Sequence, residues 1–249
     1  MIDPIEQFNI EKIFTIGHIG NQEIAFTNSS AYMFGTVALV SLLMIGGVAS
    51  KRLVPGRIQS IAEITYEFVA STVRGNAGRE GMKFFPLVFS IFMFICISNV
   101  VGIIPYAFTV SSHIIVTAAL ALMVFVTVLF YGFYKNGLKF LKIFVPSGVP
   151  IYILPLVVFI EVFSFFLRPI SHSVRLFANM LAGHIALKVF ASFIPVLAGI
   201  GIVGYFGAVL PLGMVIALTA LELLVAFLQA YVFAILTVIY LNDALHPGH

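Results

Sequence analysis

The sequence has few charged residues, a single Cys and no Trp. Asp, Glu, Lys and Arg make up 9% of its 249 residues, whereas 61% are hydrophobic and the mean hydropathy is +1.13. A soluble domain carries about 25% charged residues, so a water-soluble fold could not bury this much apolar surface. The single Cys96 excludes an internal disulfide, and the net charge of +3 is too small to indicate binding to nucleic acid. We therefore expect most of the chain to lie in lipid.

The N-terminal segment, residues 1–30, differs from a secretory signal peptide. It contains four acidic residues and one Lys, and no basic start precedes an apolar core. We expect the first apolar stretch to remain in the mature protein, with residues 1–30 as an outer N-terminal segment.

Five stretches are long and apolar enough to cross a membrane, which takes about 20 residues in a helix. They are residues 31–49, 84–104, 114–134, 151–193 and 211–241. A turn with Gly102, Pro105 and residues 111–113 separates the second stretch from the third. A Pro/Gly-rich break at 195–211, much of it apolar enough to be helical, separates the last two. The sequence predicts an all-α polytopic membrane protein with one membrane domain, residues 1–249, whose last two helices are long and strongly tilted.

A sixth helical pattern lies at residues 57–78. Its apolar residues recur at helical spacing, but Glu63, Glu67 and Arg74 leave it too polar to span a membrane. This pattern predicts an amphipathic helix lying along the membrane surface.

The positions of Lys and Arg predict the orientation of the chain. Residues 51–83 contain six of them and residues 135–142 contain three, whereas the turn at 105–113 and the break at 195–211 contain none. Loops rich in Lys and Arg stay on the cytoplasmic side. We expect a periplasmic N-terminus and a cytoplasmic C-terminus.

The segment 151–193 carries polar residues in steps of three or four, which places them on one face of a helix. They are Glu161, Ser164, Arg168, Ser171, His172, Arg175 and Asn179. A charge at membrane depth costs about 2.5–3.5 kcal/mol, so this stripe needs water or a protein partner. Arg175 has no acid within a helical turn and cannot lose its proton. It therefore requires a carboxylate from another subunit.

A second set of polar residues is divided between the last two long helices. We expect these two helices to form the ion path. His184 lies nine residues beyond Arg175, about half a turn away from the stripe by angle. Glu222 and Gln229 are seven residues apart and share a face of the helix at 211–241. A His and a Glu on adjacent helices are suited to relay a proton, because burial can bring both pKa values near neutrality.

Several of these polar residues also have a structural interpretation, whereas Arg175 is the hardest to explain in this way. A hydrogen bond to a neighbouring helix would account for His184, and Arg168 and Lys188 can reach the membrane interface. Glu161 can serve as an ion-pair partner of Arg168. The other residues with such an interpretation are Ser164, Ser171 and His172, which can bond the backbone, Asn99, which can link helices, and Asp243 and His246, which are expected to be solvated.

Three sequence blocks resemble subunit a of the rotary ATP synthase family. Residues 173–183 read SVRLFANMLAG and match the family's Arg-Leu-Phe-x-Asn-Met core. Residues 228–241, LQAYVFAILTVIYL, are similar to the family's C-terminal helix, and residues 97–105 read ISNVVGIIP. With the length and the pattern of spans, the resemblance covers nearly the whole chain.

The resemblance implies a role for each candidate residue. Arg175 would be the stator arginine that faces the carboxylates of the rotating c-ring. Asn179, His184, Glu222 and Gln229 would line the half-channel to the outside, and Glu161 and Ser164 the path to the cytoplasm. Family members carry an acid and a His at the positions of His184 and Glu222, in either order. The remaining candidates are Arg168, Ser171, His172, Asn99 and Tyr240.

The resemblance also implies the partners and the place of the chain. These are the c-ring, b-type peripheral stalk subunits and the remaining ATP synthase subunits, in a bacterial inner membrane. We expect a non-catalytic subunit without cofactor or metal, since there is no Gly-rich phosphate loop.

Two other classes of protein place polar residues in membrane helices. A secondary transporter would do so along its substrate path, but the chain has too few helices for repeated halves. An intramembrane hydrolase would need a nucleophile, and Ser164 and Ser171 are available, yet no G-x-S-x-G or H-E-x-x-H motif is present.

Overall fold

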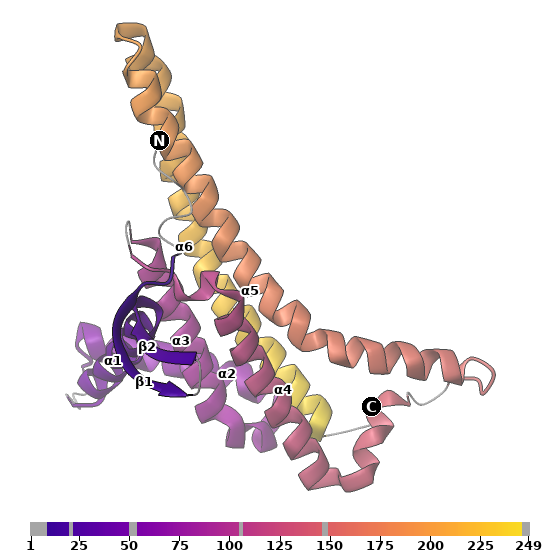
Figure 1. Ribbon diagram of the computed structural model, residues 1–249. Coiled ribbons are helices and arrows are strands. Elements are labelled where there is room, and N and C mark those ends of the chain that lie inside the picture. Colours follow the sequence, from indigo (N-terminus) through magenta and orange to yellow (C-terminus); the bar gives the residue numbers. More distant parts are fainter. Residues whose placement is uncertain (1–8, 20–21, 50–53, 105–106, 146–148, 246–249) are drawn as a thin grey trace. The chain divides into compact units, whose positions relative to one another are not determined.

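The computed structural model describes residues 9–19, 22–49, 54–104, 107–145 and 149–245 (Figure 1). Within them, five stretches are helical, long and apolar enough to cross a membrane, as the sequence predicted. The long helices are α1 (Asn28–Ala49), α2 (Arg57–Gly81), α3 (Phe85–Ile103), α4 (Ile114–Asn136), α5 (Leu154–Ala198) and α6 (Ile202–Leu245). Of these, α2 and α3 belong to one candidate span, Arg57–Ile103, joined by the short helix η2 (Met82–Phe84). The nearly all-α fold is thereby confirmed. Pro105 and His246, named above, lie outside the described residues, as do Lys51 and Arg52 of the basic segment 51–83.

The break between the last two long helices is much shorter than residues 195–211, and most of this apolar segment is helical. Helix α5 continues to Ala198 and α6 already begins at Ile202, so Pro211 lies inside a helix. The turn needs only the residues between them, because Gly201 adopts a φ of 105°, a conformation that favours glycine. Apolar residues continue through the segment, and they keep it helical despite its Pro and Gly content.

The N-terminal segment contains a β-hairpin that the sequence analysis did not predict. Strands β1 (Lys12–Ile19) and β2 (Gln22–Thr27) pair antiparallel. The rings of Phe14 and Phe26 stack with their centroids 5.0 Å apart. Lys12 and Glu23 form an exposed ion pair across the hairpin.

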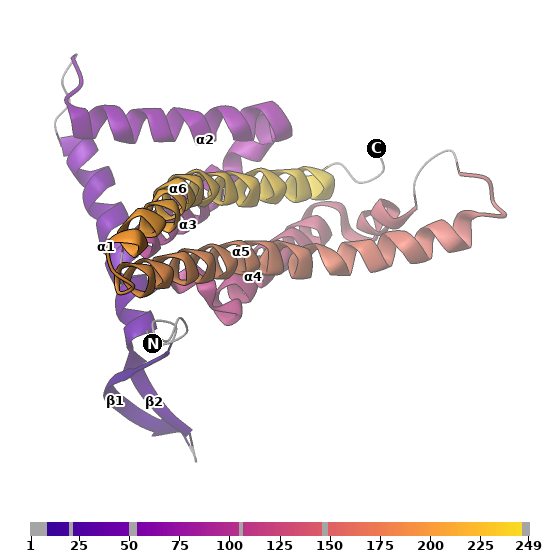
Figure 2. The same cartoon turned by 90° about the horizontal axis from the view of Figure 1, so that it is seen from above.

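The amphipathic pattern at residues 57–78 forms helix α2, whose location along a membrane surface stays a prediction. Its buried residues include Ala62, Val69 and Val73, which lie on one face. Gly78 has a φ of 60°, and this residue kinks the helix where the pattern was expected to end. Figure 2 shows α2 as a long helix. A Cβ at Gly47, in the last turns of α1, would lie 2.6 Å from the Cβ of Ala62, so the close contact of these two residues requires glycine at position 47.

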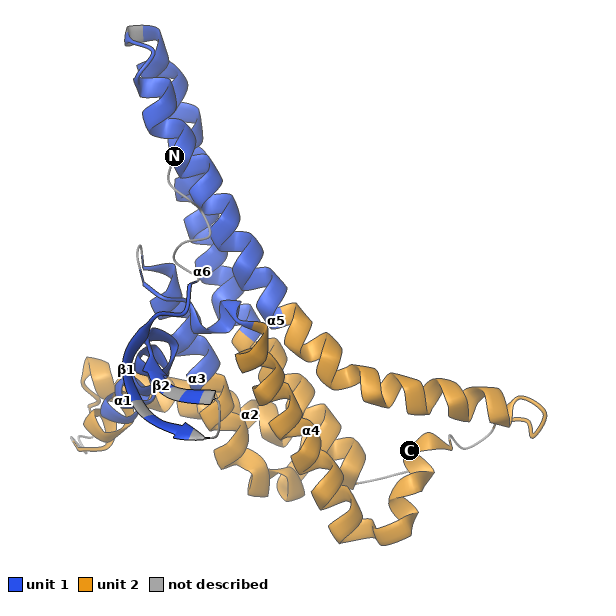
Figure 3. Cartoon of the chain, in the orientation of Figure 1, with its two compact units in different colours: residues 1–42, 94–113, 176–229 blue, residues 43–93, 114–175, 230–249 orange. Residues whose placement is uncertain are grey.

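Two compact units make up the chain (Figure 3). Unit 1 contains residues 1–42, 94–113 and 176–229, and unit 2 contains residues 43–93, 114–175 and 230–249. Helices α1, α3, α5 and α6 each contribute to both units. A single membrane domain over residues 1–249 stays a prediction.

In unit 1, the C-terminal part of α5 and the first part of α6 run antiparallel as a helical hairpin (Figures 1 and 3). The short helix η3 (Val110–Ser112) follows α3 in the same unit.

Unit 2 is built on α2, α4 and the neighbouring parts of α3, α5 and α6. Its helices are joined by side chains: the hydroxyls of Thr117 and Ser173 lie 3.0 Å apart, and Asn136 Nδ2 donates to the carbonyl of Ala244 at 2.7 Å. Another short helix, η4 (Gly137–Phe144), contains Phe140, whose ring packs against Gly132 of α4. A side chain at residue 132 would collide with this ring.

Candidate functional site

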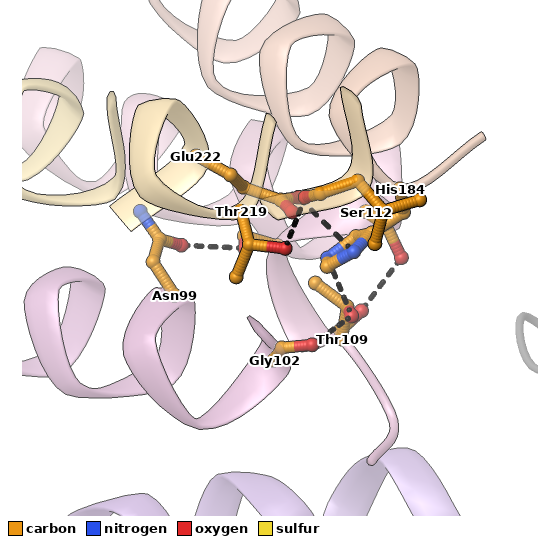
Figure 4. Close-up of polar contacts among 9 residues, drawn as sticks. Asn99, Gly102, Thr109, Ser112, His184, Thr219 and Glu222 are labelled. Atoms are coloured by element: carbon orange, nitrogen blue, oxygen red, sulfur yellow. Dashed lines mark hydrogen bonds and ion pairs between the residues drawn. The ribbon is translucent and has the colours of Figure 1, made fainter. Parts of the chain in front are cut away.

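The central feature of unit 1 is a buried His–Glu pair. His184 comes from α5 and Glu222 from α6, and each residue is 5% exposed. His184 Nδ1 lies 3.1 Å from Glu222 Oε1 (Figure 4). The structure thus brings together the two titratable residues that the sequence placed on adjacent helices.

Gly183 explains how the carboxylate reaches this position. A Cβ at residue 183 would lie 2.9 Å from Glu222 Oε1 and 3.3 Å from its Cδ. The absence of a side chain on α5 therefore lets the carboxylate lie against the helix backbone. Neither carboxylate oxygen of Glu222 accepts a hydrogen bond from the described residues. The distance of 3.1 Å between His184 Nδ1 and Glu222 Oε1 is short enough for a proton to pass between them once the two groups are aligned. Poorly aligned hydrogen bonds are common in active sites without bound substrate.

The other ring nitrogen of His184 contacts a residue that the sequence analysis missed. Thr109 Oγ1 lies 2.9 Å from His184 Nε2, and Thr109 is fully buried. Its hydroxyl also donates to the carbonyl of Gly102, at the end of α3, over 3.4 Å. The only sequence signal for Thr109 was its place in a polar turn, which gave no reason to separate it from its neighbours.

Asn99 links three elements of unit 1. Its Nδ2 donates to the carbonyl of Ala226 on α6 at 3.3 Å, and its Oδ1 accepts a hydrogen bond of 2.6 Å from Ser111 in η3. Asn99 itself is fully buried. These contacts fit the interpretation of Asn99 as a residue that links helices.

Arg175 is exposed at the middle of α5, and it is the last residue of α5 that belongs to unit 2. It forms no hydrogen bond or ion pair with any residue in the described part of the chain. Asn179, one turn further along the helix, is exposed as well. A permanent charge on an apolar helix is thus left open to whatever packs against this face.

In unit 2, Arg168 is paired with Asp243. Arg168 Nη1 lies 2.9 Å from Asp243 Oδ2, and the guanidinium carbon lies 4.9 Å from the ring centre of Tyr240. Among the described residues Glu161 forms no ion pair with Arg168, so this alternative does not hold, and Asp243, whose side chain is 33% exposed, is paired as well as partly exposed to solvent. The pattern on α5 showed only partners within one helix, whereas the actual partner comes from the end of α6.

His172 is buried beside this ion pair. It is 5% exposed, its ring centre lies 3.9 Å from that of Phe233, and it hydrogen-bonds the backbone there. Its Nε2 has no hydrogen-bond partner among the residues that the structure describes. Together with Arg168 and Tyr240, His172 lines a small cavity of about 10 Å³, the room of one water molecule.

The other sequence candidates are not joined to these clusters by hydrogen bonds or ion pairs within the described ranges. Ser164 and Ser171 are exposed, and Glu161 and Gln229 are half-buried. Nor do three His, Cys, Asp or Glu side chains of the described residues lie close enough to hold a metal ion.

Comparison with known proteins matches almost the whole chain. Residues 30–242 match the family model of the ATP synthase A chain. The sequence is 84% identical over 249 residues to ATP synthase subunit a of Rhodopseudomonas palustris strain BisB18, and the match covers 100% of both chains. It is 77% identical to ATP synthase subunit a of Nitrobacter winogradskyi over 249 residues, again 100% of both chains.

Proposed function

The chain belongs to the ATP synthase subunit a family, and from this premise we propose that it carries protons through two offset half-channels to and from the carboxylates of a c-ring. Membership makes it a membrane subunit of an ATP synthase. The proton path, the partner ring and the roles of single residues belong to the proposal.

The observation that carries the proposal is the exposed, unpaired Arg175. A charged residue at the centre of a membrane helix costs about 2.5–3.5 kcal/mol on insertion scales, and Arg cannot avoid this cost by losing its proton. Among the described residues none neutralises it. A carboxylate from a neighbouring subunit supplies the missing charge, and a c-ring supplies one after another as it turns.

The mechanism follows from this charge. A carboxylic acid that arrives beside Arg175 loses its proton, because a nearby cation favours the ionised form. The fixed cation also blocks a proton from crossing directly between the two half-channels. The carboxylate must be reprotonated from the other half-channel, so the ring turns. Each proton that crosses 100 mV supplies about 2.3 kcal/mol for this rotation.

The two half-channels use different residues. Asn179, His184, Glu222 and Gln229 line the path from the outside, where the buried pair of His184 and Glu222 passes the proton on. Glu161 and Ser164 line the path to the cytoplasm.

The chain lies in a bacterial inner membrane with a periplasmic N-terminus and a cytoplasmic C-terminus. It works with the c-ring, b-type peripheral stalk subunits and the remaining ATP synthase subunits. The subunit itself catalyses no chemical reaction.

Substitution of Arg175 tests the proposal. Arg175→Ala should abolish ATP synthesis driven by a proton gradient in vesicles that contain the whole complex, while the subunit still assembles. Arg74→Ala is the matched control, because Arg74 is an exposed Arg on α2 to which the proposal gives no role. ATP synthesis at the normal rate in the Arg175→Ala complex would contradict the proposal.

A further inference from the structure

Thr109 occupies a position that the family match alone does not explain. It is fully buried, lies on the Nε2 side of His184, and comes from the segment between α3 and α4 rather than from a long helix. Figure 4 shows His184 between Thr109 on one side and Glu222 on the other. Both ring nitrogens of His184 are therefore in contact with polar groups of the same unit.

The hydrogen-bonding capacity of Thr109 determines which nitrogen carries the proton. A hydroxyl has one hydrogen to donate and two lone pairs that accept. The carbonyl of Gly102 is an acceptor only, and it lies in the last turn of α3, where carbonyls lack helical partners. When Thr109 donates to this carbonyl, its oxygen accepts from His184, and the proton of the imidazole lies on Nε2.

The surroundings hold Thr109 in this arrangement. Gly102 leaves no room for a side chain, because a Cβ there would lie 2.8 Å from Thr109 Cγ2 and 3.0 Å from its Oγ1. The hydroxyl of Ser112 donates to the carbonyl of Thr109 at 2.6 Å and fixes its backbone. The hydroxyl thus remains between the end of α3 and the imidazole.

We propose that Thr109 is a positioning residue for proton transfer: its hydroxyl holds the His184 proton on Nε2 and leaves Nδ1 as the nitrogen that exchanges a proton with Glu222. The inference rests on the proposed function of this pair in the outer half-channel. A histidine's second hydrogen bond generally sets which ring nitrogen is free to react.

This arrangement lets a proton pass without burying additional net charge. One proton is shared between Nδ1 and Oε1, 3.1 Å apart. When it lies on the carboxyl both groups are neutral, and when it lies on Nδ1 the imidazolium and the carboxylate form an ion pair, so the sum is zero in both states. Apart from Glu222, the charged group acting on the ring is Lys188, one turn further along α5.

Two substitutions at residue 109 distinguish the effect of the hydroxyl group from the effect of the side chain's shape. Thr109→Val keeps the branched shape and removes the hydroxyl, whereas Thr109→Ser keeps the hydroxyl. Thr237→Val is the matched control, since Thr237 is also fully buried but, among the described residues, its hydroxyl bonds only the carbonyl of Phe233 in its own helix. Passive proton conduction is measured in vesicles with the assembled membrane sector after removal of the soluble sector, at several pH values.

We expect Thr109→Val to lower proton conduction about 5- to 10-fold and to change its pH profile, with Thr109→Ser and Thr237→Val within about twofold of the unmodified complex. Normal conduction in Thr109→Val, or equal losses in Thr109→Val and Thr109→Ser, would overturn the inference. If Arg175→Ala abolishes ATP synthesis driven by a proton gradient in the whole complex, the proposed function stands whatever happens at Thr109.

A measurement on the unmodified complex needs no variant at residue 109. Nitrogen NMR of the complex with ¹⁵N-labelled His reports which ring nitrogen is protonated, and the signal of His184 is identified by its loss in His184→Asn. Near neutral pH, where the pair keeps its shared proton, we expect a proton on Nε2 whichever of Nδ1 and Oε1 carries the shared one. A neutral ring protonated on Nδ1 would refute the role of Thr109.

Discussion

The carboxylate of Glu222 lies directly against Gly183, in the space that any side chain at residue 183 would occupy. A Cβ there would lie 2.9 Å from Oε1, which is too close for the carboxylate to stay in place. The contact joins the two helices of the hairpin in unit 1 at the residue that precedes His184. The geometry of the His–Glu pair therefore depends on a residue that has no functional group.

The first prediction is that Gly183→Ala slows proton transfer. The added methyl group displaces the carboxylate from Nδ1 of His184, and a shift of about 1 Å at a reacting group can cost about 100-fold in rate. We expect proton conduction of the assembled membrane sector to fall at least tenfold.

Gly213→Ala is the control for this substitution. Gly213 also lies in a long helix, but a Cβ there would have no atom within 4 Å. Alanine stabilises a helix by about 1 kcal/mol relative to glycine, so this variant should assemble and conduct normally. Equal conduction in both variants would show that the contact with Glu222 has no role in proton transfer.

Much of the fold was predictable because a helix in lipid gives a simple sequence pattern, a long apolar stretch. Each span must satisfy its backbone internally, so long apolar stretches read directly as helices. The ends were less predictable: Pro211 and the neighbouring glycines indicated a break, but α6 continues through them. Neighbouring helices can compensate for a Pro within a membrane helix, and no local pattern reveals whether they do.

The site was predictable where it follows helical spacing, and not elsewhere. His184 and Glu222 could be placed on facing helices because both interrupt long apolar helices. Thr109 could not be selected, because its contact with His184 joins residues 75 positions apart. The same holds for Arg168, whose partner Asp243 is also 75 positions away, although an acid in the same helix was available.

The second prediction concerns the ion pair of Arg168 and Asp243. The two side chains are only partly exposed, 24% and 33%, and the guanidinium also packs on the ring of Tyr240. A double-mutant cycle with Arg168→Gln and Asp243→Asn should give a coupling energy of about 1 kcal/mol. The free energy of unfolding in mixed detergent micelles measures it. Additive effects of the two substitutions would mean that the pair contributes nothing to stability.

The third prediction concerns the small cavity beside His172. Its Nε2 has no hydrogen-bond partner among the described residues, and an unpaired buried polar atom costs about 1–3 kcal/mol. An experimental structure at high resolution should show one ordered water molecule within hydrogen-bonding distance of Nε2. A cavity that is empty at that resolution would contradict this expectation.

Substitutions of His172 give an independent check. His172→Phe fills the same volume without a polar atom and should leave the free energy of unfolding within about 1 kcal/mol. His172→Ala should lower it by about 3 kcal/mol, because it leaves a cavity against Phe233. Equal losses in both variants would show that the polar ring, rather than its volume, stabilises this part of unit 2.

The fourth prediction is a pH dependence at His113, which follows η3 outside the spans. Burial lowers the pKa of this imidazole from its usual 6.5, and the ring stacks on Phe108 with centroids 4.8 Å apart. Because the open segment binds a proton more readily than the folded one, opening becomes more favourable as the pH falls below about 6.5. Hydrogen-exchange protection of residues 107–113, corrected for the intrinsic exchange rate, should therefore fall between pH 7.5 and 5.5 in the unmodified complex. In His113→Gln the same amides should keep constant protection, and a parallel decline in that variant would assign the effect to another group.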